Sequence, residues 1–88
     1  MDNDVLRRFL AKRLRELRKK MGMTQSELAK KARISLYYVQ LLEGSRTMNP
    51  SISVLTRIAD AFDLLLWQLL KFDEEDITAK GAERKSYA

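Results

Sequence analysis

The chain has 88 residues, which suits one domain built around one small hydrophobic core. It contains neither cysteine nor histidine, so we exclude a disulfide framework, a zinc finger, a thiol nucleophile and an imidazole base. The net charge is +5 and is unevenly distributed, because residues 1–22 carry +5 while residues 73–88 carry −2. The basic half suits a polyanionic partner, although for the first helix alone a solvated charged surface is the simpler interpretation.

The first predicted helix runs from about residue 4 to residue 21, and Gly22 ends it in the left-handed conformation. Large apolar residues recur at helical spacing and predict a stripe that faces the core: Leu6, Leu10, Leu14, Leu17 and Met21. Val5 and Phe9 lie to one side of this stripe, so they require a second apolar partner. The hydrophobic helix near the C-terminus is the obvious candidate.

Two short helices joined by a tight turn are predicted between residues 24 and 44. Thr24 and Glu27 form the pattern of a capping box, which satisfies two backbone donors where the first of these helices begins. Ser35 is a good cap for the second helix. At about 100° per residue the second helix divides into two faces. Tyr38, Val39 and Leu42 face inward, and the outward face contains Leu36, Tyr37, Gln40 and Leu41.

This stretch resembles the helix-turn-helix of the phage-repressor-like family of Cro/CI-type DNA-binding regulators. The likeness extends from about residue 14 to residue 70, and its pattern is Thr24-Gln25, Leu28-Ala29, Ser35, Val39 and Leu42-Glu43-Gly44. The resemblance implies an all-α, five-helix DNA-binding domain with the helix-turn-helix at helices 2 and 3. In this fold the second helix of the motif lies in the DNA major groove, and the first crosses the backbone.

The resemblance also implies contacts to the DNA backbone. Gln25 matches a family glutamine that holds a phosphate, for which the simpler alternative is an exposed residue beside the cap. Ser35 and the free N–H groups at both helix starts can bind phosphate too. The loop after the second helix matches a phosphate-contacting segment, which makes Arg46, Thr47 and Asn49 candidates, against the alternative of a solvated loop.

An ion pair between Arg18 and Glu43 is a further implication of the resemblance, because the family pairs an arginine here with the glutamate that closes the second helix. Its expected role is to fix the first helix against the recognition helix. Removal of either partner would leave a partly buried charge unpaired.

The outward face of residues 35–43 offers few groups for direct reading of bases. Gln40 is its only amide, and close phage repressors carry polar residues where this chain has Leu36, Tyr37 and Leu41. Three other ways of recognising DNA remain: apolar contact with thymine methyl groups, a hydrogen bond from a tyrosine hydroxyl to a base or phosphate, and reading of DNA shape. Operator preference is therefore expected to depend on Gln40 and Tyr37.

A fourth helix is predicted to extend to about residue 62, with either Asn49 or Ser51 as its cap. Its apolar face contains Ile52, Leu55, Ile58, Ala59 and Phe62. A fifth helix begins at Leu64 or Leu65 and runs to about residue 71. The resemblance implies a serine or threonine cap where this chain has Leu65, so we expect that helix to lack its side-chain cap.

The fifth helix is apolar nearly all round, which is more than so small a domain can bury. We therefore expect a two-fold dimer interface that contains Val5, Phe9, Leu65, Trp67 and Gln68. The alternative is that the residues after 72 fold back over this face. The domain thus comprises residues 1–72, and residues 73–88 are predicted to be a polar, flexible tail.

These observations predict sequence-preferring binding of double-stranded DNA by a small homodimeric transcriptional regulator. The alternative is a protein-interaction module or an antitoxin with the same fold, in which the apolar face of helix 3 or helix 5 docks a partner protein. We expect no enzyme activity, no cofactor and no metal site. No apolar run approaches the roughly 18 residues of a membrane span, and the lack of cysteine fits a cytoplasmic protein.

Overall fold

The computed structural model describes residues 3–46 and 49–72. This part of the chain is all-helical and contains five helices: α1 (Asn3–Lys20), α2 (Gln25–Ala32), α3 (Leu36–Glu43), α4 (Ile52–Ala61) and α5 (Leu66–Leu69). The predicted all-α, five-helix fold with a helix-turn-helix at α2 and α3 is therefore confirmed.

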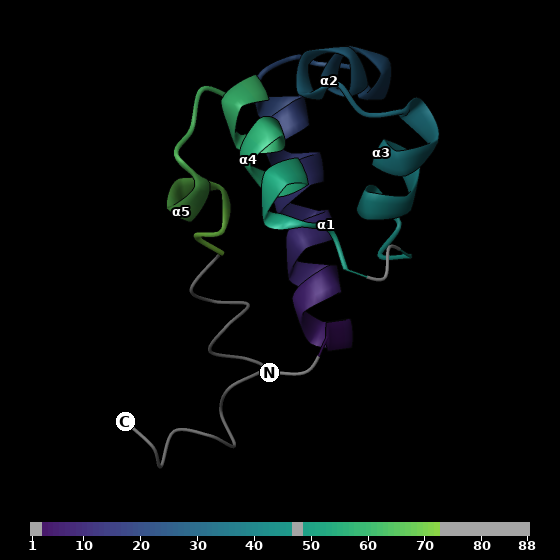
Figure 1. Ribbon diagram of the computed structural model, residues 1–88, viewed down its shortest axis with the longest axis vertical. Helices are drawn as coiled ribbons and strands as arrows, with labels where there is room; N and C mark the ends of the chain where they lie inside the picture. Colours follow the sequence, from purple (N-terminus) through teal and green to yellow (C-terminus); the bar gives the residue numbers. More distant parts are fainter. Residues whose placement is uncertain (1–2, 47–48, 73–88) are drawn as a thin grey trace.

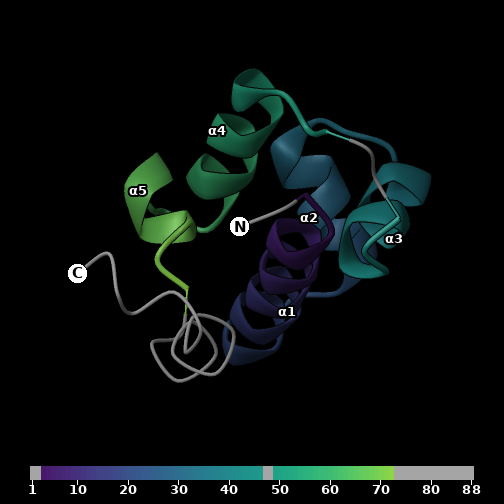
Figure 2. The same ribbon diagram turned by 90° about the horizontal axis from the view of Figure 1, so that it is seen from below.

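The long helix α1 runs through the middle of the molecule, and the shorter helices are arranged around it (Figure 1). α2 packs against both α3 and α4, α3 packs against α1, and α5 packs against α4. In both views α3 and α5 lie on opposite sides of α1 (Figures 1 and 2). The outward face of α3 and the exposed face of α5 therefore belong to different sides of the domain.

One contiguous core joins all five helices. Its largest fully buried side chains come one from each helix: Leu14, Leu28, Val39, Ile58 and Leu69. Each such side chain contributes about 1.5–3 kcal/mol through burial. Small residues on α2, Ala29 and Ala32, are also buried and allow its neighbours to approach closely.

The helix ends follow the local signals in the sequence. The Thr24 hydroxyl accepts from the Glu27 N–H at 3.1 Å, and the Glu27 carboxylate accepts from the Thr24 N–H at 2.8 Å, which completes the predicted capping box. Ser35 caps α3, and Ser51 rather than Asn49 caps α4, each hydroxyl accepting a backbone N–H at 3.0 Å. Gly22 has a φ of 64°, as expected for the left-handed residue that follows α1.

Three residues assigned to the core faces of helices are exposed instead. Leu6 is 43% exposed, because it lies near the N-terminal end of α1, which projects beyond the other helices (Figure 1). Met21 is 46% exposed, because it follows the last residue of α1. Ile52 is 71% exposed, because it is the first residue of α4. Helical spacing identifies a face correctly, but that face is buried only where another element covers it.

Phe9, which is expected at a dimer interface, is already largely covered within its own chain. Its side chain is only 7% exposed and packs against Phe72, with ring centroids 5.6 Å apart and planes inclined by 44°. The second apolar partner that Phe9 requires is thus a residue of the same chain, which follows α5. α5 is also shorter than predicted, since it covers Leu66–Leu69 only.

Candidate nucleic-acid interface

The second helix of the motif, α3, presents the outward face that its sequence predicts. Val39 and Leu42 are buried in the core, whereas Tyr37 is 69% exposed and Leu36 is 41% exposed. Gln40 is exposed as well, and Leu41 is half-buried at the edge of the face. Solvent therefore reaches the side of α3 that would have to face a nucleic acid.

Glu43 is a buried charged residue at the last position of α3. It is 5% exposed, and its two carboxylate oxygens accept from Arg18, at 2.7 Å from Nε and 3.0 Å from Nη2. The predicted ion pair is therefore present, and its fork geometry is the strong form of an arginine–carboxylate contact. The hydrogen bond to Glu43 raises the pKa of Arg18 against the opposing effect of burial.

The same carboxylate also binds α2. Gln25 Nε2 donates to Glu43 Oε1 at 3.1 Å. The side chain that is expected to contact a phosphate therefore also forms a hydrogen bond with the last residue of the recognition helix. Arg18 Nη1 additionally donates to the Met23 carbonyl at 3.1 Å, in the link between α1 and α2. One ion pair thus fixes the relative positions of three helices.

The C-terminal carbonyls of α3 are satisfied by the loop that follows and by α1. The N–H groups of Gly44, Ser45 and Arg46 donate to carbonyls of the last turn, at distances between 2.9 and 3.2 Å. Arg15 Nη1 donates to the Glu43 carbonyl at 2.5 Å. With Ser35 capping the other end, α3 is anchored at both termini and on its inner face.

The remaining candidates for backbone contact lie beside α3. Arg46 and Asn49 are both exposed in the segment between α3 and α4. Thr47 lies outside the described residues. Ser35 therefore lies at the start of α3 and Arg46 lies beyond its end.

On the opposite side of the molecule, α5 exposes two of the residues assigned to the dimer interface. Leu65 and Trp67 are each 62% exposed. Gln68 is half-buried, and its Oε1 accepts from the Leu65 N–H at 2.8 Å, which replaces half of the missing capping box. Val5 is half-buried, so the exposed apolar part of this set is narrower than predicted.

Arg13 is a structural residue that the sequence reasoning missed. Its Nη2 donates to the Gln68 carbonyl at 2.8 Å and its Nε donates to the Leu69 carbonyl at 3.2 Å, so it caps the C-terminus of α5 from α1. A signal was available, because at about 100° per residue Arg13 falls within the apolar arc of α1, between Leu6 and Phe9. A cation inside an apolar arc needs a partner there.

Two negative findings apply to residues 3–46 and 49–72. That part of the chain contains no group of acidic, histidine or cysteine side chains that could hold a metal ion. None of its helices combines the length and the apolar character needed to cross a membrane.

Comparison with known proteins gives the same fold and the same motif. A family model described as helix-turn-helix matches residues 14–66. An uncharacterized HTH-type transcriptional regulator of Archaeoglobus fulgidus is 40% identical over 68 residues, which are 77% of this chain and 96% of that protein.

Solved structures agree with this result. The hypothetical transcription factor NHTF from Neisseria has a TM-score of 0.75 and 30% identity, covering 90% of this chain and 88% of that one. SinR in the SinR protein/SinI protein complex has a TM-score of 0.66 and 27% identity, covering 90% of this chain and 82% of that one.

The fold and the exposed second helix define a helix-turn-helix DNA-binding domain. The chain belongs to the Cro/CI-type helix-turn-helix family of DNA-binding transcriptional regulators, since the family model covers more than half of it.

Proposed function

We propose that this chain is a cytoplasmic homodimeric regulator, without enzyme activity, that binds double-stranded DNA with sequence preference by placing α3 in the major groove. One observation carries the proposal. The outward face of α3 is open, with Tyr37 69% exposed, while its inner face and both its ends are fixed to the rest of the domain. A helix held in this way can enter the groove without rearrangement.

Contacts to the DNA backbone position the recognition helix. Gln25 uses one amide hydrogen on Glu43, and the second hydrogen of the same amide is available to a phosphate oxygen. Ser35, Arg46, Thr47 and Asn49 complete the proposed set of backbone contacts. These contacts supply affinity that falls as salt concentration rises, without reading sequence.

Base preference comes from the side chains that α3 exposes. The Gln40 amide can bind adenine through two hydrogen bonds, and the Tyr37 hydroxyl can reach a base edge or a phosphate. Leu36 and Leu41 provide apolar contact for thymine methyl groups. With one amide on the face, we expect a short A·T-containing half-site rather than an extended one.

A homodimer would place two such helices on one operator. Leu65 and Trp67 supply the exposed apolar face on α5, which lies on the opposite side of α1 from α3 (Figures 1 and 2). Contact between two α5 helices would leave both recognition helices free. The two helices would then enter successive major grooves about 34–36 Å apart.

A protein-interaction module or antitoxin is the second candidate function. It would use the apolar surface that Leu36 and Tyr37 expose on α3, and one structural neighbour is a SinR protein/SinI protein complex. In this case α3 or α5 would dock a partner protein. Such docking would depend little on salt, because it would bury apolar surface rather than displace counterions.

Selection of bound sequences from a random pool of DNA duplexes tests the main proposal. We expect a pseudo-palindromic consensus and a log Kd that increases linearly with log salt concentration. Arg46→Ala should weaken binding of all duplexes to a similar degree and reduce the salt slope by about one. Lys71→Ala removes the same charge beyond α5 and should change neither quantity.

Two results together would contradict the DNA-binding proposal. The selection would enrich no duplex, and the chain would bind a partner protein independently of salt, with Tyr37→Asp abolishing that binding. Tyr37→Asp weakens binding of the partner under both interpretations, of DNA in one and of protein in the other, so the salt slope is the deciding measurement. Loss of affinity in Lys71→Ala equal to that in Arg46→Ala would place the phosphate contacts elsewhere.

A further inference from the structure

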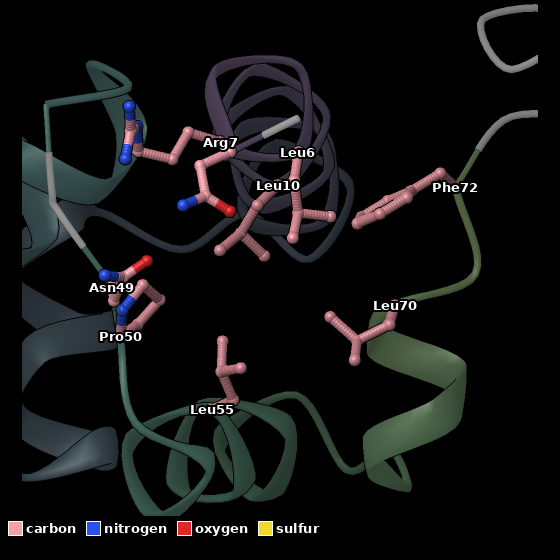
Figure 3. A pocket seen from close by; sticks show the side chains of 9 residues that line it. Leu6, Arg7, Leu10, Asn49, Pro50, Leu55, Leu70 and Phe72 are labelled. Carbon is pink, nitrogen blue, oxygen red and sulfur yellow. The ribbon is translucent and has the colours of Figure 1, made fainter. Parts of the chain in front are cut away.

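Beside α5 the surface contains an apolar hollow of about 290 Å³ (Figure 3). Its apolar walls come from three directions: Leu6 and Leu10 from α1, Pro50 and Leu55 from the segment before α4 and from α4 itself, and Leu70 and Phe72 from the residues after α5. Figure 3 shows these side chains pointing into the space, while the Arg7 side chain extends away from its centre. Arg7 pairs there with Asp4 of its own helix.

Most of the residues that line this hollow lie outside the segment that the family model matches. Leu6, Leu10, Leu70 and Phe72 all fall outside residues 14–66, the segment that the family model covers. Phe72 forms part of the wall because its ring packs on Phe9. The hollow is therefore built by the N-terminal half of α1, by the start of α4 with the residues just before it, and by the residues that follow α5, and no residue of α3 lines it.

The hollow is continuous with the exposed face of α5. Leu70 follows Trp67 by three positions, so the two side chains lie on the same side of the helical turn. Leu70 is 36% exposed and lines the hollow, whereas Trp67 is 62% exposed and does not line it. One surface of the chain thus carries both a protruding indole and an apolar depression.

The size of α5 argues for an occupant that uses both features. A helix of four residues is too small to bury the roughly 800 Å² per partner that a stable complex requires. A two-fold interface is self-complementary, so a group that protrudes from one copy must meet a depression in the other. A small-molecule ligand fits less well, since such sites use a few convergent polar groups to orient the ligand, whereas this lining is mainly apolar and its polar members are Asn3, Arg7 and Asn49.

We propose that a second copy of this chain fills the hollow, with Trp67 of each subunit inserted among Leu6, Leu55 and Leu70 of its partner. The proposal rests on the homodimer proposed above and specifies how that dimer is held together. It also accounts for a large aromatic side chain at an exposed position of a short helix, where it would otherwise cost solubility. Buried aromatic anchors of this kind carry much of the affinity of an interface.

Trp67 is the only tryptophan of the chain, so its fluorescence reports its own surroundings. We expect the emission maximum to move to shorter wavelength as protein concentration rises through the range in which sedimentation shows dimer formation. Trp67→Ala should weaken dimerisation by about 30-fold or more, as for an interface hot spot. In the parent protein, the Trp67 emission should also become resistant to an aqueous quencher as the concentration rises through the same range.

Two exchanges on α1 make a matched pair for this test. Leu6→Glu places a charge in the hollow and should keep the protein monomeric, with Trp67 emission independent of concentration. Met21→Glu makes the same change at the other end of α1, where the side chain is 46% exposed against 43% for Leu6, and should leave dimerisation intact. Circular dichroism of both variants in the monomeric range confirms that each is folded.

The outcomes separate this proposal from the homodimer on which it rests. A dimer whose Trp67 emission does not change with concentration, or a dimer that Leu6→Glu leaves at full strength, overturns insertion into the hollow while the homodimer stands. Monomers at every concentration, free and on DNA, overturn both. A shift in emission that Leu6→Glu abolishes and Met21→Glu preserves supports the proposal.

Discussion

At the scale of single residues, the Glu43 carboxylate has the largest structural consequence. It is buried, and its cost of desolvation is offset by Arg18 and Gln25, which together supply three hydrogen bonds. Loss of one partner of such a pair costs more than the pair itself contributes, because the other charge remains buried and unpaired. The Arg18 side chain is only 16% exposed, so water cannot replace the carboxylate easily.

We therefore expect Glu43→Gln to lower the free energy of unfolding by about 3 kcal/mol, towards the lower end of the range for a broken buried pair. In a domain of this size the melting temperature should fall by at least about 10 °C. Asp60→Asn, at an exposed position of α4, removes the same charge and should have little effect. An unchanged melting temperature in Glu43→Gln would show that the pair contributes nothing to stability.

Glu27 provides a residue-scale prediction on pH. Hydrogen bonds from the Thr24 N–H and hydroxyl lower the pKa of the Glu27 carboxyl below its ordinary value, with a smaller contribution from the charge of Lys31. A carboxyl whose pKa is lower in the folded state stabilises the fold above the unfolded pKa, near 4.5. That stabilisation is lost as the pH falls through the folded pKa.

Thermal unfolding measured across the acidic range checks this sign. Glu27→Gln keeps an oxygen that can accept from the Thr24 N–H but cannot titrate, so the melting temperature of the variant should depend less steeply on pH below about 5. Above that range the variant should be slightly less stable than the parent, because its amide lacks the charge that the hydrogen bonds favour, and the two curves should converge in acid. A parent and variant with parallel curves throughout the acidic range would show that the capping carboxylate does not contribute to acid unfolding.

Sequence alone identified some of these residue contacts and missed others, for a physical reason. The capping box depends on a local spacing of three residues, so it can be read directly from Thr24 and Glu27. Arg18 and Glu43 lie 25 positions apart, and only the family resemblance brought them together. The bonds of Gln25 to Glu43 and of Arg13 to α5 depend on how whole helices cross, which no local pattern encodes.

At the scale of elements, the connection between α4 and α5 is the least favourable segment locally. Asp63 has a φ of 58°, a left-handed conformation that glycine adopts at lower cost, and Leu65 has no side chain able to cap α5. α5 forms nevertheless, because Leu69 is fully buried, Gln68 binds the Leu65 N–H and Arg13 binds the final carbonyls. Tertiary contacts thus replace the missing local signals.

Repairing either local signal should stabilise the protein. We expect Asp63→Gly to raise the free energy of unfolding by about 0.5–1 kcal/mol, and Leu65→Thr by about 1 kcal/mol through its new cap. Each would raise the melting temperature by several degrees in thermal denaturation. Leu65→Thr should also weaken dimerisation, since Leu65 is exposed on the proposed interface.

Asp60→Gly is the matched control for the first exchange, because Asp60 lies inside α4 and has helical geometry. There glycine should destabilise the domain by about 0.5–1 kcal/mol. If Asp63→Gly and Asp60→Gly lose stability to a similar extent, then the left-handed conformation of Asp63 carries no strain that glycine relieves.

The same elements show how far sequence patterns determine helix boundaries and burial. α1 to α4 were predicted to within about two residues, because Thr24, Ser35, Ser51 and Gly22 mark their ends. α5 was predicted too long, since a continuous apolar run contains no stop signal. Exposure of Leu6 and Ile52 could not be predicted, because burial depends on which neighbour reaches a helix end.

At the scale of the whole molecule, α1 connects the recognition helix to the proposed dimer helix. Arg15 and Arg18 bind the end of α3, while Arg13 binds the end of α5. α3 and α5 lie on opposite sides of α1 (Figures 1 and 2). Any contact between two α5 helices would therefore set the distance between two α3 helices through rigid helical packing rather than through a flexible linker.

Such rigidity predicts a strict spacing between half-sites. Binding should be strongest when the centres of the two half-sites are about 10–10.5 base pairs apart. Insertion of roughly half a turn, about 5 base pairs, would turn one half-site to the other face of the duplex, and affinity should fall by about 100-fold or more as the second contact is lost.

Insertion of a full turn, about 10 base pairs, distinguishes a rigid dimer from a flexible one. A full turn returns both half-sites to the same face but separates them by roughly a further 34 Å, which a dimer joined by packed helices cannot span. We therefore expect electrophoretic mobility-shift titrations to show weak binding for both insertions. Recovery of affinity with the full-turn insertion would show that the two recognition helices are joined by a flexible connection, and the rigid path from α3 through α1 to α5 would then be wrong.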